Sequence, residues 1–311
     1  MEQPPDAGDS GAASPDEWAQ SSSSTALTDA LDASSMGWIP VKGGKRALKI
    51  PTQNRGEQLL TAQEFAGDCL RLSMPLPAVR WKKKRAYLNL AWASGAVNYI
   101  KACQTEAGDL LFAIDLPLET LIPVALPLYC QHLATWCDIT TKEITAEDGL
   151  VEARPIPLRR ISTGFRLQPE TARKQVQELF QQLDLPWREY REDVYVTALE
   201  MPFFGTPVPT DFTVRIHSDC VSFCLPFGTG SYFDKDAGAD KDVFANILRF
   251  NHKQAIGKLA IDDEGLLVLW LDLARPYLGV IDDLSRLSEK VFASGALVVE
   301  GGPLTVRMRY E

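Results

Sequence analysis

Asp115 and Asp272 are two acidic residues with matching surroundings. Each follows a glycine and an apolar run, Leu110–Ile114 in one case and Leu266–Leu271 in the other. Two carboxylates related in this way could form a pair across a pseudo-twofold axis, and paired carboxylates shift each other's pKa and share protons. Acidic residues are also favoured where a helix or turn begins. We expect each aspartate to cap the segment that follows it.

The other polar residues give little indication of catalysis or metal binding. Cys130 and His132 lie two residues apart on an expected helix and so point to different faces, His252 has no neighbouring acid or thiol at metal-ligand spacing, and His217 adjoins a hairpin turn, so we expect none of the three to bind a metal. The segment Asp234–Gly238 resembles part of a calcium loop but lacks the third acid and the final glutamate. The sequence contains no phosphate-binding glycine loop, no nucleophile elbow and no zinc-protease motif. We therefore predict no catalytic residue, no cofactor and no metal.

The cysteines favour a reducing compartment. The chain has six, and none form a C-x-x-C pair. Cys220 and Cys224 are too far apart along an expected strand to bridge, and Cys130 and Cys137 are two helical turns apart. Reduced, buried thiols are expected, which is typical of a cytoplasmic protein.

Composition and charge exclude several classes of protein. The 311 residues are 45% hydrophobic and 23% charged, as in soluble globular proteins. We expect no membrane span and no secretory signal. A net charge of −9 disfavours nucleic-acid binding, and the single basic run, Arg80–Arg85, is expected to be a solvated turn where a helix starts.

The second half of the chain repeats the first. Trp38 precedes Asp68 much as Trp187 precedes Asp219, and each of these aspartates is followed by a cysteine and an apolar run. Asp68 and Asp219 lie 151 residues apart, and Asp115 and Asp272 lie 157 apart. At the second spacing, Lys101 matches Lys258 and Asn89 matches Asn246. The insertion falls in the Gly/Asp/Lys-rich loop at 228–241. A chain of two similar modules is expected to imitate a dimer.

Each module is predicted to contain a helix, strands, a helix, a strand and a final helix. In the first copy we expect strands at Arg46–Ile50 and Cys69–Met74, helices at Lys82–Cys103 and Leu118–Trp136, and either structure at Glu57–Phe65. Pro123 and Pro127 predict that the last of these helices begins late or is kinked.

The second copy shows clearer signals. A first helix begins near Pro169, and strands are predicted at Tyr190–Leu199, Asp211–Ile216 and Cys220–Leu225, the last two as a hairpin. Helices are predicted at Asp242–Leu259 and Tyr277–Phe292, and a last strand at Leu304–Tyr310.

The predicted fold class is α+β, with two similar modules, each an antiparallel sheet packed with helices, arranged as a pseudo-dimer. The predicted boundaries are a disordered segment at 1–24, module 1 at 25–139, a linker at 140–168 and module 2 at 169–311.

This order of elements resembles the class I type III secretion chaperones and the YbjN-like proteins that share their fold. The segments that carry the resemblance are Phe244–Asn251, Gly257–Gly265 and Leu267–Leu273, with a looser match over Asn89–Leu116. The resemblance implies a non-enzymatic, acidic protein that holds an extended segment of a partner protein. That partner would be a secreted or signalling protein, and the chain would be a monomer with internal pseudo-twofold symmetry or a weak homodimer.

Aromatic residues of the predicted sheet are the candidates for partner binding. They are Tyr195, Phe203, Phe204, Phe223 and Trp270, each of which could instead pack in the core. Neither a nucleic acid nor a membrane is expected as a partner. Two alternatives remain, a small-molecule sensor or enzyme with a pocket between the modules, and a structural subunit of an assembly.

Overall fold

The computed structural model describes most of the two predicted modules. The described residues are 25–66, 68–76, 83–121, 123–145, 168–203, 206–227, 241–262, 266–293, 298–299 and 302–303. Several predicted segments lie outside them: the N-terminal segment 1–24, most of the linker, the calcium-like loop Asp234–Gly238 and the last strand Leu304–Tyr310.

Module 1 contains a six-stranded sheet, here called sheet A. Its strands lie in the order β1-β2-β3-β4-β6-β5, and every neighbouring pair is antiparallel. Their bounds are β1 Ile39–Pro40, β2 Arg46–Thr52, β3 Gly56–Phe65, β4 Cys69–Pro75, β5 Lys101–Gln104 and β6 Leu110–Pro117.

Module 2 contains sheet B, which has the same strand order. From the outer edge inwards the order is β7-β8-β9-β10-β12-β11, again antiparallel throughout. The bounds are β7 Trp187–Arg191, β8 Val194–Phe203, β9 Thr206–Ile216, β10 Val221–Phe227, β11 Lys258–Ile261 and β12 Leu267–Leu273. Both sheets share the same strand order and are antiparallel throughout. The chain is therefore an α+β protein of two similar modules, as predicted.

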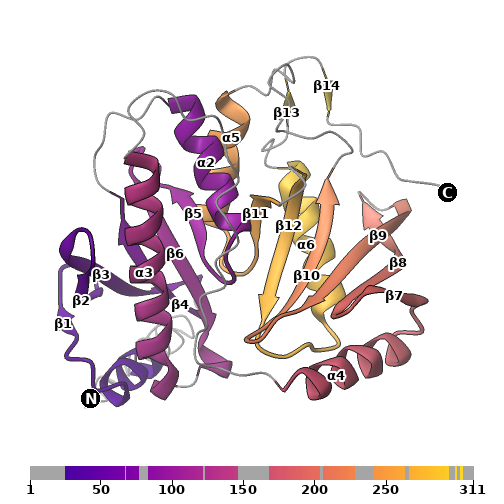
Figure 1. The fold of residues 1–311 in the computed structure, drawn as a ribbon, viewed down its shortest axis with the longest axis horizontal. Helices are drawn as coiled ribbons and strands as arrows, with labels where there is room; N and C mark the ends of the chain where they lie inside the picture. The colour runs from indigo at the N-terminus through magenta and orange to yellow at the C-terminus, as the bar shows by residue number, and fades with distance from the viewer. Residues whose placement is uncertain are drawn as a thin grey trace, which may run out of the picture.

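Helices occupy matching places in the two modules. A helix at residues 25–33 precedes sheet A as α4 precedes sheet B, and α3 and α6 pack on the two sheets. Figure 1 shows α3 crossing the face of sheet A, and α2 and α5 side by side between the sheets. The bounds are α2 Lys83–Gly95, α3 Leu126–Thr145, α4 Pro169–Gln182, α5 Lys241–Lys253 and α6 Val280–Ala293. Short 3-10 turns lie at Leu118–Thr120 and Pro123–Ala125, and a small ladder pairs β13 Val298–Val299 with β14 Gly302–Pro303.

Two predicted helices were too long, because a short strand follows each true helix. α2 ends at Gly95 and β5 follows, where one helix was predicted to Cys103; α5 ends at Lys253 and β11 follows, where one was predicted to Leu259. All four residues of β5 and of β11 are buried. A fully buried strand has no alternation of polar and apolar residues, so its pattern merges with that of the helix before it.

Other predictions met the structure more closely. The ambiguous segment Glu57–Phe65 is strand β3, and the hairpin around Ser218-Asp219 is formed by β9 and β10. The predicted strand at Tyr190–Leu199 is instead the β7–β8 hairpin, since Asp193 takes a φ of 61° in the turn between them. The late start predicted from the prolines is confirmed, because α3 begins at Leu126; it then continues to Thr145, past the predicted boundary at residue 139.

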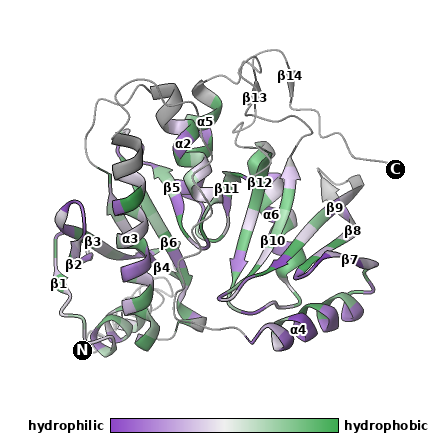
Figure 2. Ribbon diagram, viewed as in Figure 1, coloured by the Kyte–Doolittle hydropathy of each residue, from purple (hydrophilic) through white to green (hydrophobic). Residues whose placement is uncertain are grey.

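The two hydrophobic cores are built partly from each other's helices. Ala91 and Trp92 of α2 belong to the core of module 2, and Leu248 of α5 belongs to the core of module 1. Ala91 and Leu248 are 157 residues apart and therefore equivalent. α2 packs on β11 while α5 packs on β5, so each module completes the other. Figure 2 shows largely apolar colouring along β10 and β12 and polar colouring along much of α4.

Among the helices in the described part of the chain, none combines the length and the apolar character needed to cross a membrane.

Candidate binding site between the modules

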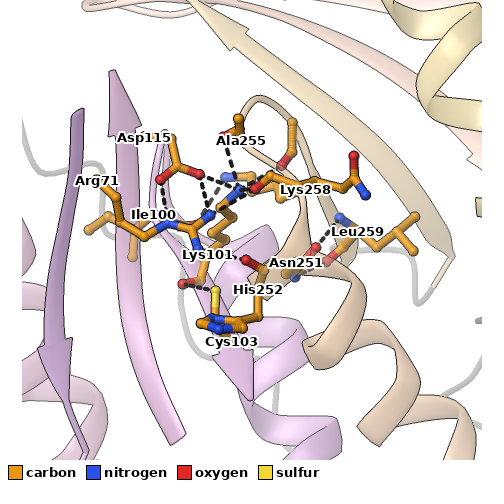
Figure 3. Close-up of polar contacts among 12 residues, drawn as sticks. Arg71, Ile100, Lys101, Cys103, Asp115, Asn251, His252, Ala255, Lys258 and Leu259 are labelled. Carbon is orange, nitrogen blue, oxygen red and sulfur yellow. Dashed lines mark hydrogen bonds and ion pairs between the residues drawn. The ribbon is translucent and has the colours of Figure 1, made fainter. Parts of the chain in front are cut away.

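A buried carboxylate with two cations lies at the centre of module 1's contact with module 2. Arg71 on β4 pairs directly with Asp115 on β6, and its Nε and Nη2 donate to the Asp115 oxygens at 2.7 and 2.9 Å. Lys101 Nζ lies 2.6 Å from Asp115 Oδ2. All three side chains are at most 3% exposed. Figure 3 shows them converging from three strands of sheet A.

Both cations also reach across to module 2. Arg71 donates to the carbonyls of His252 at 2.6 Å and Gln254 at 2.8 Å, just where α5 ends. Lys101 donates to the carbonyls of Gln254 at 2.5 Å and Gly257 at 3.3 Å. The last carbonyls of a helix have no partner within the helix and carry partial negative charge. The two cations therefore cap α5 and fix its end against sheet A.

A similar ion pair, with a lysine that contacts carbonyls of the other module, occurs in module 2, where serine replaces the arginine. Lys258 on β11 lies 2.9 Å from Asp272 on β12 and donates to the carbonyls of Val97 at 2.5 Å and Ile100 at 3.4 Å. Those carbonyls are equivalent, at a spacing of 157, to the ones that Lys101 contacts. Ser222 is paired with Asp272 as Arg71 is paired with Asp115. The Ser222 hydroxyl donates a hydrogen bond to Asp272 Oδ1 at 2.5 Å.

The surroundings of Asp272 keep it ionised. Burial alone would raise its pKa, but the charge of Lys258, the Ser222 hydroxyl and the Tyr99 N–H together lower the pKa below its usual value. The Tyr99 N–H comes from module 1 and lies 2.8 Å from the carboxylate. The ionised form is thus held by donors from both modules.

A cavity lies beside Asp272, where Ser222 stands opposite the carboxylate on one side and opposite Arg215 of β9 on the other. The cavity has a volume of about 470 Å³ and lies between the end of α2 and the β7–β8, β9 and β12 side of module 2. Its lining residues come from both modules: Gly95–Asn98, Arg191–Val194, Arg215–His217, Ser222, Trp270 and Asp272. It is large enough for a small organic molecule.

The cysteine thiols near the Asp115 ion pair are poor nucleophiles. All six cysteines are unbridged and buried. Burial raises the pKa of Cys103 to about 11 and that of Cys69 to about 12, so both stay protonated and weakly nucleophilic at neutral pH. In the described part of the chain, no group of three or more His, Cys, Asp or Glu side chains is arranged to hold a metal ion.

The predicted capping role of Asp115 and Asp272 was wrong. Both lie inside strands and bind buried lysines, and the 3-10 turn after β6 has Pro117 at its N-cap. They do occupy equivalent positions about the pseudo-twofold relation, but each is neutralised separately rather than paired with the other. A buried carboxylate needs a nearby cation in the fold. The residue pattern that marks the start of a helix does not show where that cation lies.

The structure buries most of the described aromatic residues that were predicted to bind a partner. Tyr195 is 1% exposed and Phe223 is fully buried in the core of module 2, so a partner docking on the folded domain cannot reach them. Trp270 is 7% exposed and lines the cavity. Phe203 ends β8, and Phe204 lies outside the described residues. Apolar positions of a sheet covered by helices pack inwards, so Tyr195 and Phe223 are core residues.

Sequence reasoning missed Arg71 and Ser222, which distinguish the two sites. The signal was present in the alignment of the copies: Asp68 and Asp219 differ by 151 residues, and the same shift takes residue 71 to residue 222. An arginine inside an otherwise apolar strand indicates a buried counter-charge.

Comparison with known proteins leaves the family open. No family model matches the chain, and no curated protein matches it. Among solved structures, aspartate kinase from Synechocystis is similar at 10% identity with a TM-score of 0.15, over 82% of this chain and 44% of the kinase chain. This chain therefore spans less than half of that protein's length, and a likeness at this TM-score carries no argument about fold or function.

Proposed function

We propose that this chain is a non-enzymatic cytoplasmic binding protein that holds an extended segment of a partner protein, as its resemblance to the secretion chaperones implies. The observation that carries the proposal is the open edge of sheet B at β7. The internal pseudo-dimer supplies a rigid frame for this edge, and the six unbridged cysteines are typical of a reducing compartment.

Strand β7 offers both backbone and side chains to a partner. It ends the order of sheet B, it pairs only with β8 among the described strands, and all five of its residues are exposed. Tyr190 is 69% exposed and Trp187 is 38% exposed, while the Trp187 ring packs against Phe180 and Tyr195. Unpaired N–H and C=O groups on such an edge bind an extended peptide as an additional strand.

Charged residues on β7 favour a specific partner over self-association. Arg188, Glu189 and Arg191 share this strand with the two aromatic residues. Charged side chains on an edge discourage two copies of the same edge from pairing. A partner segment with apolar and acidic residues would contact both kinds of side chain.

The test uses affinity capture from native cytosol with brief cross-linking, comparing the wild type with Tyr190→Glu. The control is Val124→Ser, which changes a 77% exposed residue on module 1. The proposal expects a protein cross-linked to β7 that Tyr190→Glu loses and Val124→Ser retains. Recovery of no partner, or equal recovery by all three proteins, contradicts it.

The cavity beside Asp272 favours a second function, small-molecule binding. It lies between the modules and is lined by both, which is a usual place for a ligand site. A thermal-shift screen with a broad metabolite library tests this function directly. A ligand should raise the melting temperature, and a flat response across the library would remove it from consideration.

A further inference from the structure

We propose that the outer face of strands β1, β2 and β3 in sheet A is a docking surface whose occupant is the acidic segment at residues 1–24 of the same chain. This surface, called the β1–β3 face, is formed by Ile39, Val41, Lys45, Ala47, Lys49 and Leu59. The inference goes beyond the proposed function, because it depends neither on strand addition at β7 nor on a ligand in the cavity beside Asp272.

The strand registers place two exposed apolar side chains on this face. Ile39 pairs with Ala47, and Lys49, two positions further along β2, pairs with Leu59. Side chains two positions apart on one strand point to the same side of a sheet. Ile39 and Leu59 therefore lie on one face, with Ala47 between them, and they are 58% and 48% exposed.

The opposite side of these strands is the packed one. Leu48 and Leu60 belong to the core of module 1 together with residues of α3. Val41 continues the exposed row, because it lies two positions after Ile39 and its N–H bonds to the Lys45 carbonyl; it is 40% exposed. Exposed apolar side chains that are gathered in one place and rimmed by charged residues mark an interaction surface.

The charged residues around this surface are mostly basic. Lys42 and Lys45 are exposed where β1 turns into β2, and Lys49 is exposed beside Leu59. Glu57 is the acidic neighbour of Lys49, at 3.4 Å. From residue 38 to residue 50 the chain has four basic residues and no acidic residue. The β1–β3 face therefore fits a segment that combines acidic and apolar side chains.

The segment at residues 1–24 has this composition. It contains five acidic residues and no lysine or arginine. Asp16 and Glu17 directly precede Trp18, which is the one aromatic residue of the segment. Trp18 would contact the apolar side chains of the β1–β3 face while the two acids lie beside its lysines.

The connection to the described part of the chain is long enough. The helix at residues 25–33 packs Leu27 and Leu31 into the core of module 1, behind the β1–β3 face. Figure 1 shows this helix at the same end of the molecule as β1. Trp18 lies seven residues before Thr25, and seven extended residues span at most about 24 Å. That length lets the chain pass round the β1 edge from the helix side to the outer face.

The tether favours the chain's own segment over other occupants. A short flexible link gives a bound segment an effective concentration in the millimolar range, so weak apolar and ionic contacts are enough to hold it. A second copy would bring its own lysines against the same lysines. The chain's net charge of −9 opposes approach to an anionic membrane. Pro40 has no N–H to offer at this edge, so side-chain contacts rather than an added strand hold the segment.

The first experiment is zero-length carbodiimide cross-linking of the full chain at low protein concentration, with the links located by mass spectrometry. We expect links within one chain from Asp16 or Glu17 to the lysines of the β1–β3 region, Lys42, Lys45 and Lys49. The exposed lysines Lys174 on α4 and Lys253 on α5 serve as references and should not react. Links mainly to these references, links only between two copies, or no link to the β1–β3 region overturns the inference.

The second experiment measures the rate at which chymotrypsin cleaves after Trp18 in the full chain. Docking protects this bond, so the double variant Ile39→Ser/Leu59→Ser should be cleaved at least about threefold faster, and Lys45→Glu should also be cleaved faster. The control is Val124→Ser, which changes an exposed apolar residue elsewhere on module 1 and should match the wild type. Circular dichroism checks that each variant is folded. Equal cleavage rates for the wild type and the folded β1–β3 variants contradict the proposal.

Sedimentation with vesicles of phosphatidylserine and phosphatidylcholine separates this inference from a membrane-binding surface. We expect the wild type to stay in the supernatant. Vesicle binding by the wild type that Ile39→Ser/Leu59→Ser loses would assign the β1–β3 face to a lipid surface and overturn docking of residues 1–24.

Discussion

Replacing Asp115 with asparagine is the sharpest test of how the two modules are held together. The change keeps the size of the side chain but leaves Arg71 and Lys101 buried without a counter-charge. Breaking a buried ion pair by removing one partner costs about 3–5 kcal/mol. Asp272→Asn strands only Lys258, so its cost should be smaller. We therefore expect Asp115→Asn to lose at least ~3 kcal/mol of unfolding free energy and Asp272→Asn to lose less.

The assay is urea denaturation followed in parallel by tryptophan fluorescence and circular dichroism. Coincident transitions are needed before a free energy is derived, because a two-module chain can unfold in steps. Glu57→Gln is the control: it breaks the exposed Lys49–Glu57 pair, whose side chains are 68% and 66% exposed, and should change stability by less than ~1 kcal/mol. A loss below ~1 kcal/mol in Asp115→Asn, or a larger loss in Asp272→Asn, would refute the reasoning.

Three further predictions follow from single residues. Burial, with a smaller effect of Lys258, lowers the pKa of His132 to about 4, so the unfolded chain binds a proton first as the pH falls. The free energy of unfolding should therefore drop by about 3 kcal/mol between about pH 6.5 and pH 4. Urea titrations of His132→Leu at several pH values should lack this drop, and a pH dependence equal to that of the wild type would contradict the prediction. The pKa of Asp272 is lowered in the folded protein, so its contribution to the free energy of unfolding should be present above its unfolded pKa of about 4 and be lost as the pH falls through the folded pKa. Equal unfolding free energies for Asp272→Asn and the wild type at every pH would oppose this. In Gly95→Ala the new Cβ would overlap the Ile261 carbonyl oxygen, so the melting temperature should fall, although Gly→Ala within a helix ordinarily gains up to ~1 kcal/mol of stability. The control is Gly279→Ala, whose new Cβ meets only the movable Tyr277 ring, and equal melting temperatures for the two variants would contradict the clash.

Much of the fold follows from periodic patterns in the sequence. The β9–β10 hairpin, the late start of α3 and the amphipathic α4 all have local signals in turn residues, prolines and apolar spacing. Strands β5 and β11 have none, because they are short and buried on every side. Their place is fixed by tertiary contacts, such as the Ser94 hydroxyl that accepts from the Ala102 N–H and the equivalent Asn251 bond to Leu259.

The site was harder to predict than the fold. The matched aspartates and lysines were visible in the repeat, but their roles depend on strand pairing that brings residues 44 positions apart into contact. The cavity is lined by residues of both modules that lie far apart in the sequence, so no local pattern indicates it. Backbone carbonyls have no sequence signature, so a site built largely from them is found only when the two modules are seen together.

Separating the two modules tests the central claim, that this chain is a pseudo-dimer whose halves complete each other, most directly. Residues 25–145 and 168–311 would be produced as two chains and studied alone and mixed by native mass spectrometry and circular dichroism. Trp92 belongs to the core of module 2 and Leu248 to that of module 1, and Lys101 and Lys258 bond across the boundary. We predict that neither half is a stable folded monomer and that mixing restores a folded 1:1 complex. Two halves that each fold as monomers and do not associate would contradict the account.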